Sequence, residues 1–315
     1  MFTPSLWSEI NLKNIASNCD LVRQRIPKKT RFMAVVKANA YGHGDAAVAQ
    51  TAVKNGADWL AVARLDEGVS LRKQGLQVPI LIFGATPVQE LSTLLDYDLT
   101  PTLASGPMAE AFSHQAAALG IRLQAHLKID TGMGRLGIVA VPNTPEQGPF
   151  LPQAVEEVIH VCRLPGLDVQ GIYTHLAQAD ADDLTHAQGQ VDCFSSLLQA
   201  LSDHGLEFPL RHAANSAAVL RLPQAHLDLV RPGLMLYGLS PRPEDAGITR
   251  DLHPALSLKA RIALVKTVAP GFKISYGSTF TTDKKTTIAT IPIGYADGFF
   301  RILSNQGQML VHGEP

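Results

Sequence analysis

The sequence has few of the features that mark exported, membrane-bound or nucleic-acid-binding proteins. It has three cysteines in 315 residues, Cys19, Cys162 and Cys193, and their wide spacing is typical of reduced thiols. It has no apolar run near the roughly 18 residues of a membrane span and no basic, then apolar, N-terminal leader. The net charge of -1 gives no basis for attraction to nucleic acid or an anionic membrane. We therefore expect a cytoplasmic protein with neither partner.

The first two thirds of the chain have an alternating sequence pattern. Short β-branched apolar runs alternate with longer amphipathic stretches, which indicates repeated βα units and a parallel sheet. The candidate strands are 32–37, 59–63, 79–83, 99–103, 123–129, 169–174, 210–214 and 227–230, and the candidate helices are 12–25, 45–54, 65–73, 107–119, 152–161 and 184–202. Eight strands with helices between them favour a closed (β/α)8 TIM-type barrel, with an open doubly wound sheet as the alternative.

The texture changes near Leu256. Short alternating runs at 262–268, 286–293 and 309–312, separated by polar turns, are typical of antiparallel β structure. A proline, glycine and charge cluster at 240–247 indicates a linker. We expect a barrel domain over 12–240 and a mainly antiparallel, incomplete β domain over 241–315, which the strand at 1–11 joins.

Lys37 closes an apolar run and precedes the turn Ala-Asn-Ala-Tyr-Gly-His-Gly. A lysine where a buried strand meets such a turn can lose its proton and attack a carbonyl carbon, so it is a Schiff-base candidate. The alternative is a lysine whose amine reaches solvent at a strand end.

Other unusual polar residues follow the later strands. Arg135, His175, Ser216 and Arg231 all come after the C-terminal ends of predicted strands, where barrels carry their active sites. The loops after the last two strands are the usual phosphate site, and Ser216 and Gly233 suit it, although Ser216 could be a helix N-cap and Gly233 a turn glycine. A phosphate site beside a Schiff-base lysine predicts bound pyridoxal 5'-phosphate.

Several long motifs resemble those of the alanine racemase family. They are Val-Val-Lys-Ala-Asn-Ala-Tyr-Gly-His-Gly (35–44), Lys-Ile-Asp-Thr-Gly-Met-Gly-Arg-Leu-Gly (128–137), Thr-His-Leu-Ala (174–177), Ala-Asn-Ser-Ala (214–217), Arg-Pro-Gly (231–233), Ser-Tyr-Gly (275–277) and Ile-Gly-Tyr-Ala-Asp-Gly (293–298). The resemblance runs over essentially the whole chain. It implies an isomerase, an amino-acid racemase that interconverts L-alanine and D-alanine on a pyridoxal phosphate aldimine and supplies D-alanine for peptidoglycan.

The resemblance also implies roles for individual residues. Lys37 holds the cofactor and is the base for D-alanine, and Tyr276, from the partner subunit of a homodimer, is the base for L-alanine. The implied cofactor contacts are Tyr41, Ser216 and Gly233 at the phosphate, His175 beside the ring and Arg231 at the pyridine nitrogen. The implied substrate and supporting residues are Arg135 at the carboxylate, Tyr295 at the substrate entry, Lys128, which is carbamylated in some relatives, and Asn215. The family's β domain continues with a Cys-Met-Asp segment and a late tyrosine that have no counterpart here.

Three alternatives stay open at this point. A decarboxylase of the same barrel type would want an acidic residue at the pyridine nitrogen, where Arg231 is expected. A non-catalytic carrier of the cofactor would not need Tyr276, which could also be an ordinary strand aromatic packed on its neighbours. A metal hydrolase could use His126, His175 and His212, but it lacks the paired histidines expected on the first strand, so we predict no metal.

Overall fold

The computed structural model describes residues 4–141, 150–242, 247 and 250–315. The chain divides into two compact units, which we call the barrel unit (Asn11–Ala255) and the C-terminal unit (Met1–Ile10 with Leu256–Pro315). Residues 243–246 of the expected linker lie outside the described residues. The domain boundary expected at 240–241 stays a prediction.

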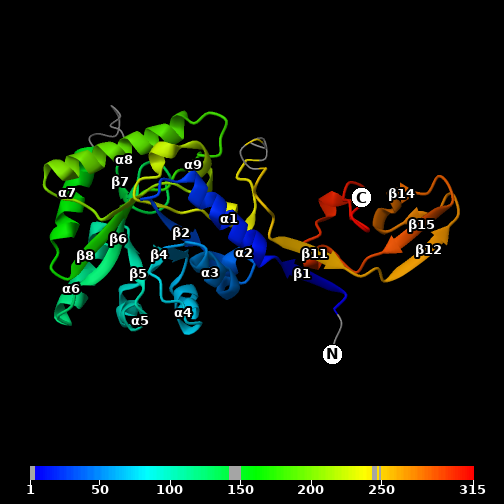
Figure 1. Ribbon diagram of the computed structural model, residues 1–315, viewed down its shortest axis with the longest axis horizontal. Helices are drawn as coiled ribbons and strands as arrows, with labels where there is room; N and C mark the ends of the chain where they lie inside the picture. The colour runs from blue at the N-terminus through cyan, green and yellow to red at the C-terminus, as the bar shows by residue number, and fades with distance from the viewer. Residues whose placement is uncertain (1–3, 142–149, 243–246, 248–249) are drawn as a thin grey trace. The chain divides into compact units, whose positions relative to one another are not determined.

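Parallel strands form a barrel in the first unit (Figure 1). Its strand order is β10-β2-β3-β4-β5-β6-β8-β9, with the short β7 attached to β6. The bounds are β2 Arg31–Val35, β3 Trp59–Val62, β4 Ile80–Ala85, β5 Thr100–Leu103, β6 Leu123–Asp130, β7 Ile138–Val139, β8 Leu167–Tyr173, β9 Leu210–His212 and β10 Leu229–Val230. Hydrogen bonds from Asp228 N to Arg211 O (3.1 Å) and from Arg231 N to Ala214 O (2.9 Å) join the last strand to β9. The predicted barrel is therefore confirmed, and the open sheet is wrong.

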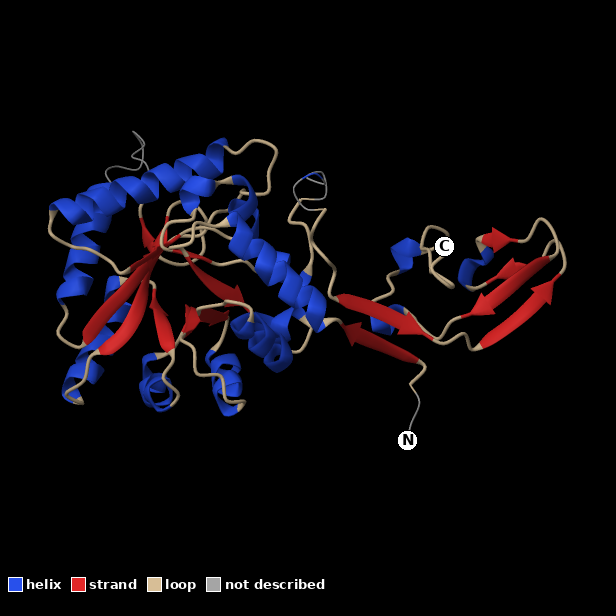
Figure 2. Ribbon diagram, viewed as in Figure 1, coloured by secondary structure: helices blue, strands red, loops and turns tan. Residues whose placement is uncertain are grey.

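Helices cover the outside of this barrel (Figure 2). The bounds are α1 Leu12–Arg25, α2 Lys37–Tyr41, α3 Asp45–Lys54, α4 Leu65–Lys73, α5 Leu91–Asp96, α6 Gly106–Ala118, α7 Phe150–Arg163, α8 Thr185–Asp203 and α9 Ser216–Arg221, with 3-10 turns η1 Val88–Glu90, η2 Pro223–Ala225 and η3 Leu234–Tyr237. The six predicted helices are present within about two residues of their expected ends. The sequence analysis missed α2, α5 and α9, which are too short to show a helical period.

Alternate residues of the barrel strands face two different cores. On β2, Phe32 and Ala34 pack in the layer between strands and helices, whereas Met33 and Val35 pack inside the barrel. Side chains of successive strand residues point to opposite faces, so both faces of a covered strand must be apolar. This explains why β2, β3 and β4 read as largely apolar runs, whereas β6 also carries the buried polar side chains of His126 and Lys128.

The C-terminal unit consists of antiparallel strand pairs. They are β1 (Leu6–Ile10) with β11 (Leu256–Ala260), β12 (Leu264–Val268) with β15 (Thr286–Thr290), and β13 (Lys273–Ile274) with β14 (Phe280–Thr281). Short 3-10 turns, η4 (Tyr276–Ser278), η5 (Tyr295–Asp297) and η6 (Arg301–Leu303), interrupt them. The strand expected at 309–312 is wrong, because only an isolated bridge between Val311 and Glu314 forms there.

Candidate active site

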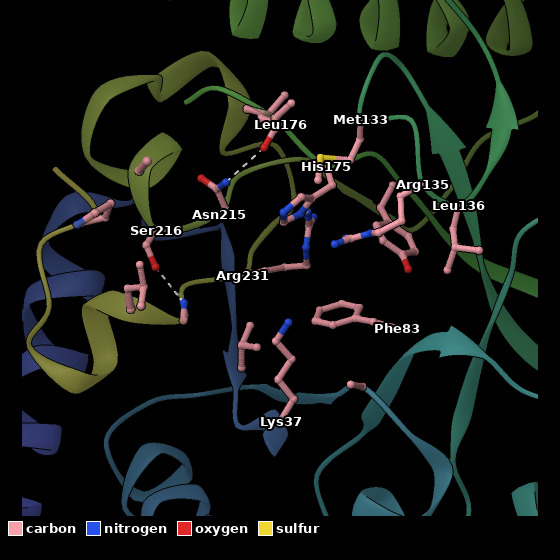
Figure 3. Close-up of a pocket in the computed structure, with 18 of the residues that line it drawn as sticks. Lys37, Phe83, Met133, Arg135, Leu136, His175, Leu176, Asn215, Ser216 and Arg231 are labelled. Carbon is pink, nitrogen blue, oxygen red and sulfur yellow. Dashed lines mark hydrogen bonds between the residues drawn. The ribbon is translucent and has the colours of Figure 1, made fainter. Parts of the chain in front are cut away.

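A cavity of about 490 Å³ opens at the C-terminal ends of the barrel strands. Nine of the predicted site residues line it: Lys37, Tyr41, Lys128, Arg135, His175, Asn215, Ser216, Arg231 and Gly233. The nitrogen atoms of Lys37, Arg135 and Arg231 point toward a common space (Figure 3). The barrel thus brings together residues that lie up to almost 200 positions apart in the sequence.

Lys37 begins a left-handed turn rather than ending a strand. Strand β2 ends at Val35, two residues before the predicted end, and α2 follows. Ala38, Asn39, Ala40 and Tyr41 have φ angles of 52°, 54°, 52° and 53°. For residues with a Cβ this conformation costs about 1–2 kcal/mol each, and such strain persists mainly where function requires it.

The turn places lysine and tyrosine together. Lys37 and Tyr41 both line the cavity, and Lys37 Nζ lies 5.9 Å from the centre of the Tyr41 ring. Burial raises the pKa of Tyr41, so its hydroxyl keeps its proton and can donate a hydrogen bond.

Ser216, Gly233 and Tyr41 form one side of the cavity. Ser216 Oγ accepts hydrogen bonds from Gly233 N (2.8 Å) and Met235 N (3.3 Å). The N-cap alternative for Ser216 is wrong, because Asn215 caps α9 by accepting from Ala218 N at 3.0 Å. A Cβ atom on residue 233 would lie 2.8 Å from Tyr41 Oη, so a larger residue here would displace the Tyr41 hydroxyl. The hydroxyl groups of Ser216 and Tyr41 can donate hydrogen bonds here, which suits an anion.

Arg231 is buried and fixed by four acceptors. It donates from Nη1 to His212 Nδ1 (2.9 Å) and from Nη2 to Thr174 O (2.7 Å), Ala213 O (3.0 Å) and His175 Nδ1 (3.3 Å). Burial lowers the pKa of Arg231 to about 10, which still leaves it charged near neutrality. Its orientation is therefore set by the barrel, before any ligand binds.

Because a guanidinium can only donate, both histidines that contact it accept through Nδ1. His175 and His212 therefore carry their proton on Nε2. Burial, and then the charges of Arg231 and other nearby cations, lower the pKa of His175 to about 3, so this ring is neutral and offers an N–H donor.

Because His212 carries its proton on Nε2, it donates a hydrogen bond to His126 Nδ1 at 3.0 Å. His126 Nε2 is buried without a hydrogen-bond partner. In the described part of the chain, no three histidine, cysteine or carboxylate side chains are grouped so that they could hold a metal ion. Of the three histidines in the metal-hydrolase alternative, His175 and His212 are bonded to the Arg231 guanidinium, and His126 is bonded to His212.

A carboxylate shapes the loop that carries Arg135. Asp130 Oδ1 accepts from the N–H groups of Gly132 (2.9 Å), Met133 (2.8 Å) and Gly134 (3.1 Å), and Oδ2 accepts from Arg135 N (2.9 Å). Burial raises the pKa of Asp130, but these donors outweigh burial, so the net pKa lies below its usual value. The sequence analysis missed this role, although an aspartate before two glycines is a known turn signal.

Lys128 lies near the end of β6, just before this loop. Its Nζ donates to Ile129 O (2.6 Å) and lies 5.4 Å from the centre of the Tyr173 ring. Burial, and then the charge of Arg231, lower its pKa to about 7. Tyr173 also stacks on His212 at 4.6 Å, a contact that the sequence did not indicate.

Tyr276 and Tyr295 belong to the C-terminal unit and are not among the residues that line the cavity. Tyr276 lies in turn η4 with 87% of its surface exposed, so its description as a packed strand aromatic is wrong. Its neighbours Ser275 and Ser278 have φ angles of 61° and 51°. Tyr295 lies in turn η5 and is 59% exposed.

Comparison with known proteins covers almost the entire chain. Models of the alanine racemase N-terminal domain and C-terminal domain match residues 10–241 and 255–315. An alanine racemase from Carboxydothermus hydrogenoformans is 46% identical over 309 residues, which are 98% of this chain and 80% of the relative. None of the helices among the described residues has the length and apolarity that crossing a bilayer requires.

Solved structures agree. The alanine racemase of Streptomyces lavendulae superposes with a TM-score of 0.88 at 35% identity, covering all of this chain and 80% of that one. The alanine racemase of Bartonella henselae, solved with covalently bound pyridoxal phosphate, gives 0.81 at 25% identity, covering 96% and 79%. The chain belongs to the alanine racemase family.

Proposed function

We propose that this chain interconverts L-alanine and D-alanine by proton transfer between two bases, Lys37 and Tyr276, placed on opposite faces of the substrate. Racemisation is the reaction of its family, which depends on pyridoxal phosphate, and supply of D-alanine for peptidoglycan is the family's known role. The observation that carries the residue assignment is the cavity in which Lys37, the Ser216–Gly233 side and Arg231 meet.

The residues of the cavity fit pyridoxal phosphate. The side of the cavity that Tyr41, Ser216 and Gly233 line, with two hydroxyl groups and a residue without a side chain, suits the phosphate. Lys37 would hold the aldehyde, Arg231 would donate to the pyridine nitrogen and His175 would flank the ring. Once bound to an amino acid, this cofactor withdraws electrons from the α-carbon and makes its proton acidic.

The two bases need opposite positions because racemisation removes a proton from one face and returns it to the other. Lys37 acts at the α-carbon from the face of the barrel, where D-alanine presents its proton. Tyr276 acts on the other face, for L-alanine. Arg135 binds the substrate carboxylate, since its guanidinium can donate two parallel hydrogen bonds, and Asn215 and Lys128 support the site.

His175 and Arg231 contribute positive potential. A phenol accepts a proton only as phenolate, and the Nε2–H of neutral His175, polarised by Arg231, is a suitable donor to it. With an arginine, rather than a carboxylate, facing it, the pyridine nitrogen would stay unprotonated, which would disfavour side reactions and speaks against the decarboxylase alternative.

We further propose that Tyr276 reaches the cavity of a second copy, so that the active form is a homodimer, with Tyr295 at the substrate entry. The 87% exposure of Tyr276 and the strained backbone on either side of it support this role, because strain gathers at functional turns. The three cysteines are all free, which supports a cytoplasmic location.

The test follows the fate of the α-proton in deuterated water. The unchanged chain should incorporate deuterium into both enantiomers, whereas a carrier would incorporate none. Tyr276→Phe should lose exchange from L-alanine by a factor on the order of 100 or more and keep a larger share of exchange from D-alanine. Unaltered exchange from L-alanine in this variant would refute the assignment. Borohydride reduction followed by peptide mapping should recover the cofactor on Lys37.

A further inference from the structure

Beyond the end of the pairing between β2 and β3, three backbone N–H groups donate hydrogen bonds to one side chain, that of Glu67. The ladder ends with the hydrogen bond from Val36 N to Ala61 O (2.9 Å). Beyond it, Glu67 Oε1 accepts from Ala38 N at 2.6 Å, and Glu67 Oε2 accepts from Ala63 N at 2.7 Å and from Arg64 N at 3.0 Å. One carboxylate thus joins the turn that follows Lys37 to the end of the neighbouring strand.

Two of these three contacts have an ordinary explanation. Glu67 lies in the first turn of α4, where a glutamate that accepts from the N-cap residue Arg64 is a common helix start. The positive end of the helix also favours a carboxylate there. The hydrogen bond to Ala38 N has no such explanation, because Ala38 is not part of that helix and lies 29 residues away.

Ala38 is the first residue of the left-handed run that continues to Tyr41. Two further side-chain hydrogen bonds hold the run: Asn39 Oδ1 accepts from Asp45 N (3.0 Å), and Tyr41 O accepts from His43 Nδ1 (3.1 Å). Residues with a Cβ adopt this conformation in succession only when their surroundings impose it. Glu67 fixes the end of the run next to Lys37, and so the direction from which the lysine enters the cavity.

We propose that Glu67 is a positioning residue for the racemisation, whose carboxylate holds the left-handed turn that presents Lys37 and Tyr41 to the cofactor. This inference rests on the proposed function of Lys37. Glu67 does not line the cavity, so it acts through the turn and not by contact with the ligand.

The test compares Glu67→Gln with Asp66→Asn in the full chain. A glutamine has one acceptor oxygen, so no side-chain orientation satisfies both Ala38 N and the pair at Ala63 and Arg64. Asp66, the adjacent residue, forms an exposed pair with Arg64 (3.0 Å) and, among the described residues, no hydrogen bond to the turn 38–41, so its replacement removes the same charge from the same helix turn. Three quantities are measured: amide exchange of the peptide 36–44 without cofactor, the Kd of pyridoxal phosphate and the thermal midpoint.

We expect Glu67→Gln to speed exchange in the peptide 36–44 and to raise the Kd of pyridoxal phosphate, each roughly 10-fold. Asp66→Asn should change neither by more than about 2-fold. Exchange and Kd that match the control would overturn the proposal, even if the thermal midpoint falls. That result would mean that Glu67 stabilises only the start of α4. If the unchanged chain fails to bind the cofactor at Lys37, the proposed function fails, while the exchange measurement still decides whether Glu67 holds the turn.

Discussion

The two units differ in how much of their apolar surface they bury. The barrel unit encloses large side chains completely, among them Tyr237, Phe32, Phe112 and Phe194. In the described residues of the C-terminal unit, Thr282 is the one buried side chain, and Phe300 and Ile302 are 67% and 80% exposed. The cavity residues are therefore fixed by a core of their own, whereas Tyr276 is displayed on a surface whose apolar side chains are free to meet another surface. The following predictions test that contrast.

The largest effect should come from the barrel side. Lys37→Ala should lower racemisation in both directions by a factor on the order of 1,000 or more, because it removes both a base and the covalent attachment. Enantiomer analysis and the absorbance of bound cofactor measure the two losses. Tyr276→Phe is the matched comparison, since it should keep the bound cofactor. A Lys37→Ala protein that retains racemisation in either direction would contradict the division of roles.

Removing the buried cation should destabilise the barrel unit strongly. Arg231→Met leaves four buried acceptors without a donor, and we expect the free energy of unfolding to fall by about 3 kcal/mol or more. Urea denaturation measures it. Arg31→Met, which removes an exposed arginine from β2, is the control and should change stability by less than about 0.5 kcal/mol. Equal losses in the two variants would show that the contacts of Arg231 do not support the barrel.

Lys128 should make the stability depend on pH. Its folded pKa of about 7 lies below the ordinary 10.5, so between these values the unfolded state binds more protons and stability rises with pH, by at most about 1.4 kcal/mol per pH unit. Lys128→Met should flatten this slope, whereas Lys13→Met on the exposed part of α1 should not. Urea denaturation across this pH range gives the slopes. An unchanged slope in Lys128→Met would mean that the amine is not desolvated.

The two tryptophans report on the two units separately. Trp7 lies in β1 of the C-terminal unit and is half-buried, whereas Trp59 lies in β3 inside the barrel core. In Trp59→Phe, which retains Trp7, fluorescence should change at a urea concentration about 1 M lower than in Trp7→Phe, because the C-terminal unit has little buried apolar surface. If the two variants unfold at the same urea concentration, the units unfold together, and the C-terminal unit is not the less stable of the two.

The smallest effect should come from the Arg135 loop. In Asp130→Asn the amide oxygen can still accept from Gly132 and its neighbours, but the amide nitrogen faces Arg135 N. We expect kcat/KM for alanine to fall about 5-fold, equivalent to about 1 kcal/mol. Asp168→Asn, at the distant start of β8, serves as the control. A decrease confined to cofactor binding would assign Asp130 a different role.

The sequence predicted much of the barrel and nine of the residues that line its cavity. Apolar runs and helical periods located eight strands and six helices, because burial on both faces of a strand leaves a pattern in the local sequence. Glycine motifs pointed to the loops of Lys37, Arg135 and Arg231. The C-terminal unit was predicted less well, since short strands and 3-10 turns carry almost no periodicity.

What the sequence determined by itself is the order of the βα units and the residue types at the ends of the strands, because those follow from local composition. The tertiary structure decided the left-handed turn after Lys37, the protonated nitrogen of His175 and the two carboxylates, Glu67 and Asp130, that hold the loops. The hydrogen bonds of Glu67 to Ala38 N and of His175 to Arg231 join groups that meet only when the strands lie side by side, whereas Asp130 bonds within its own loop. A pattern along the chain contains no information about which buried groups will share a proton or an acceptor in space.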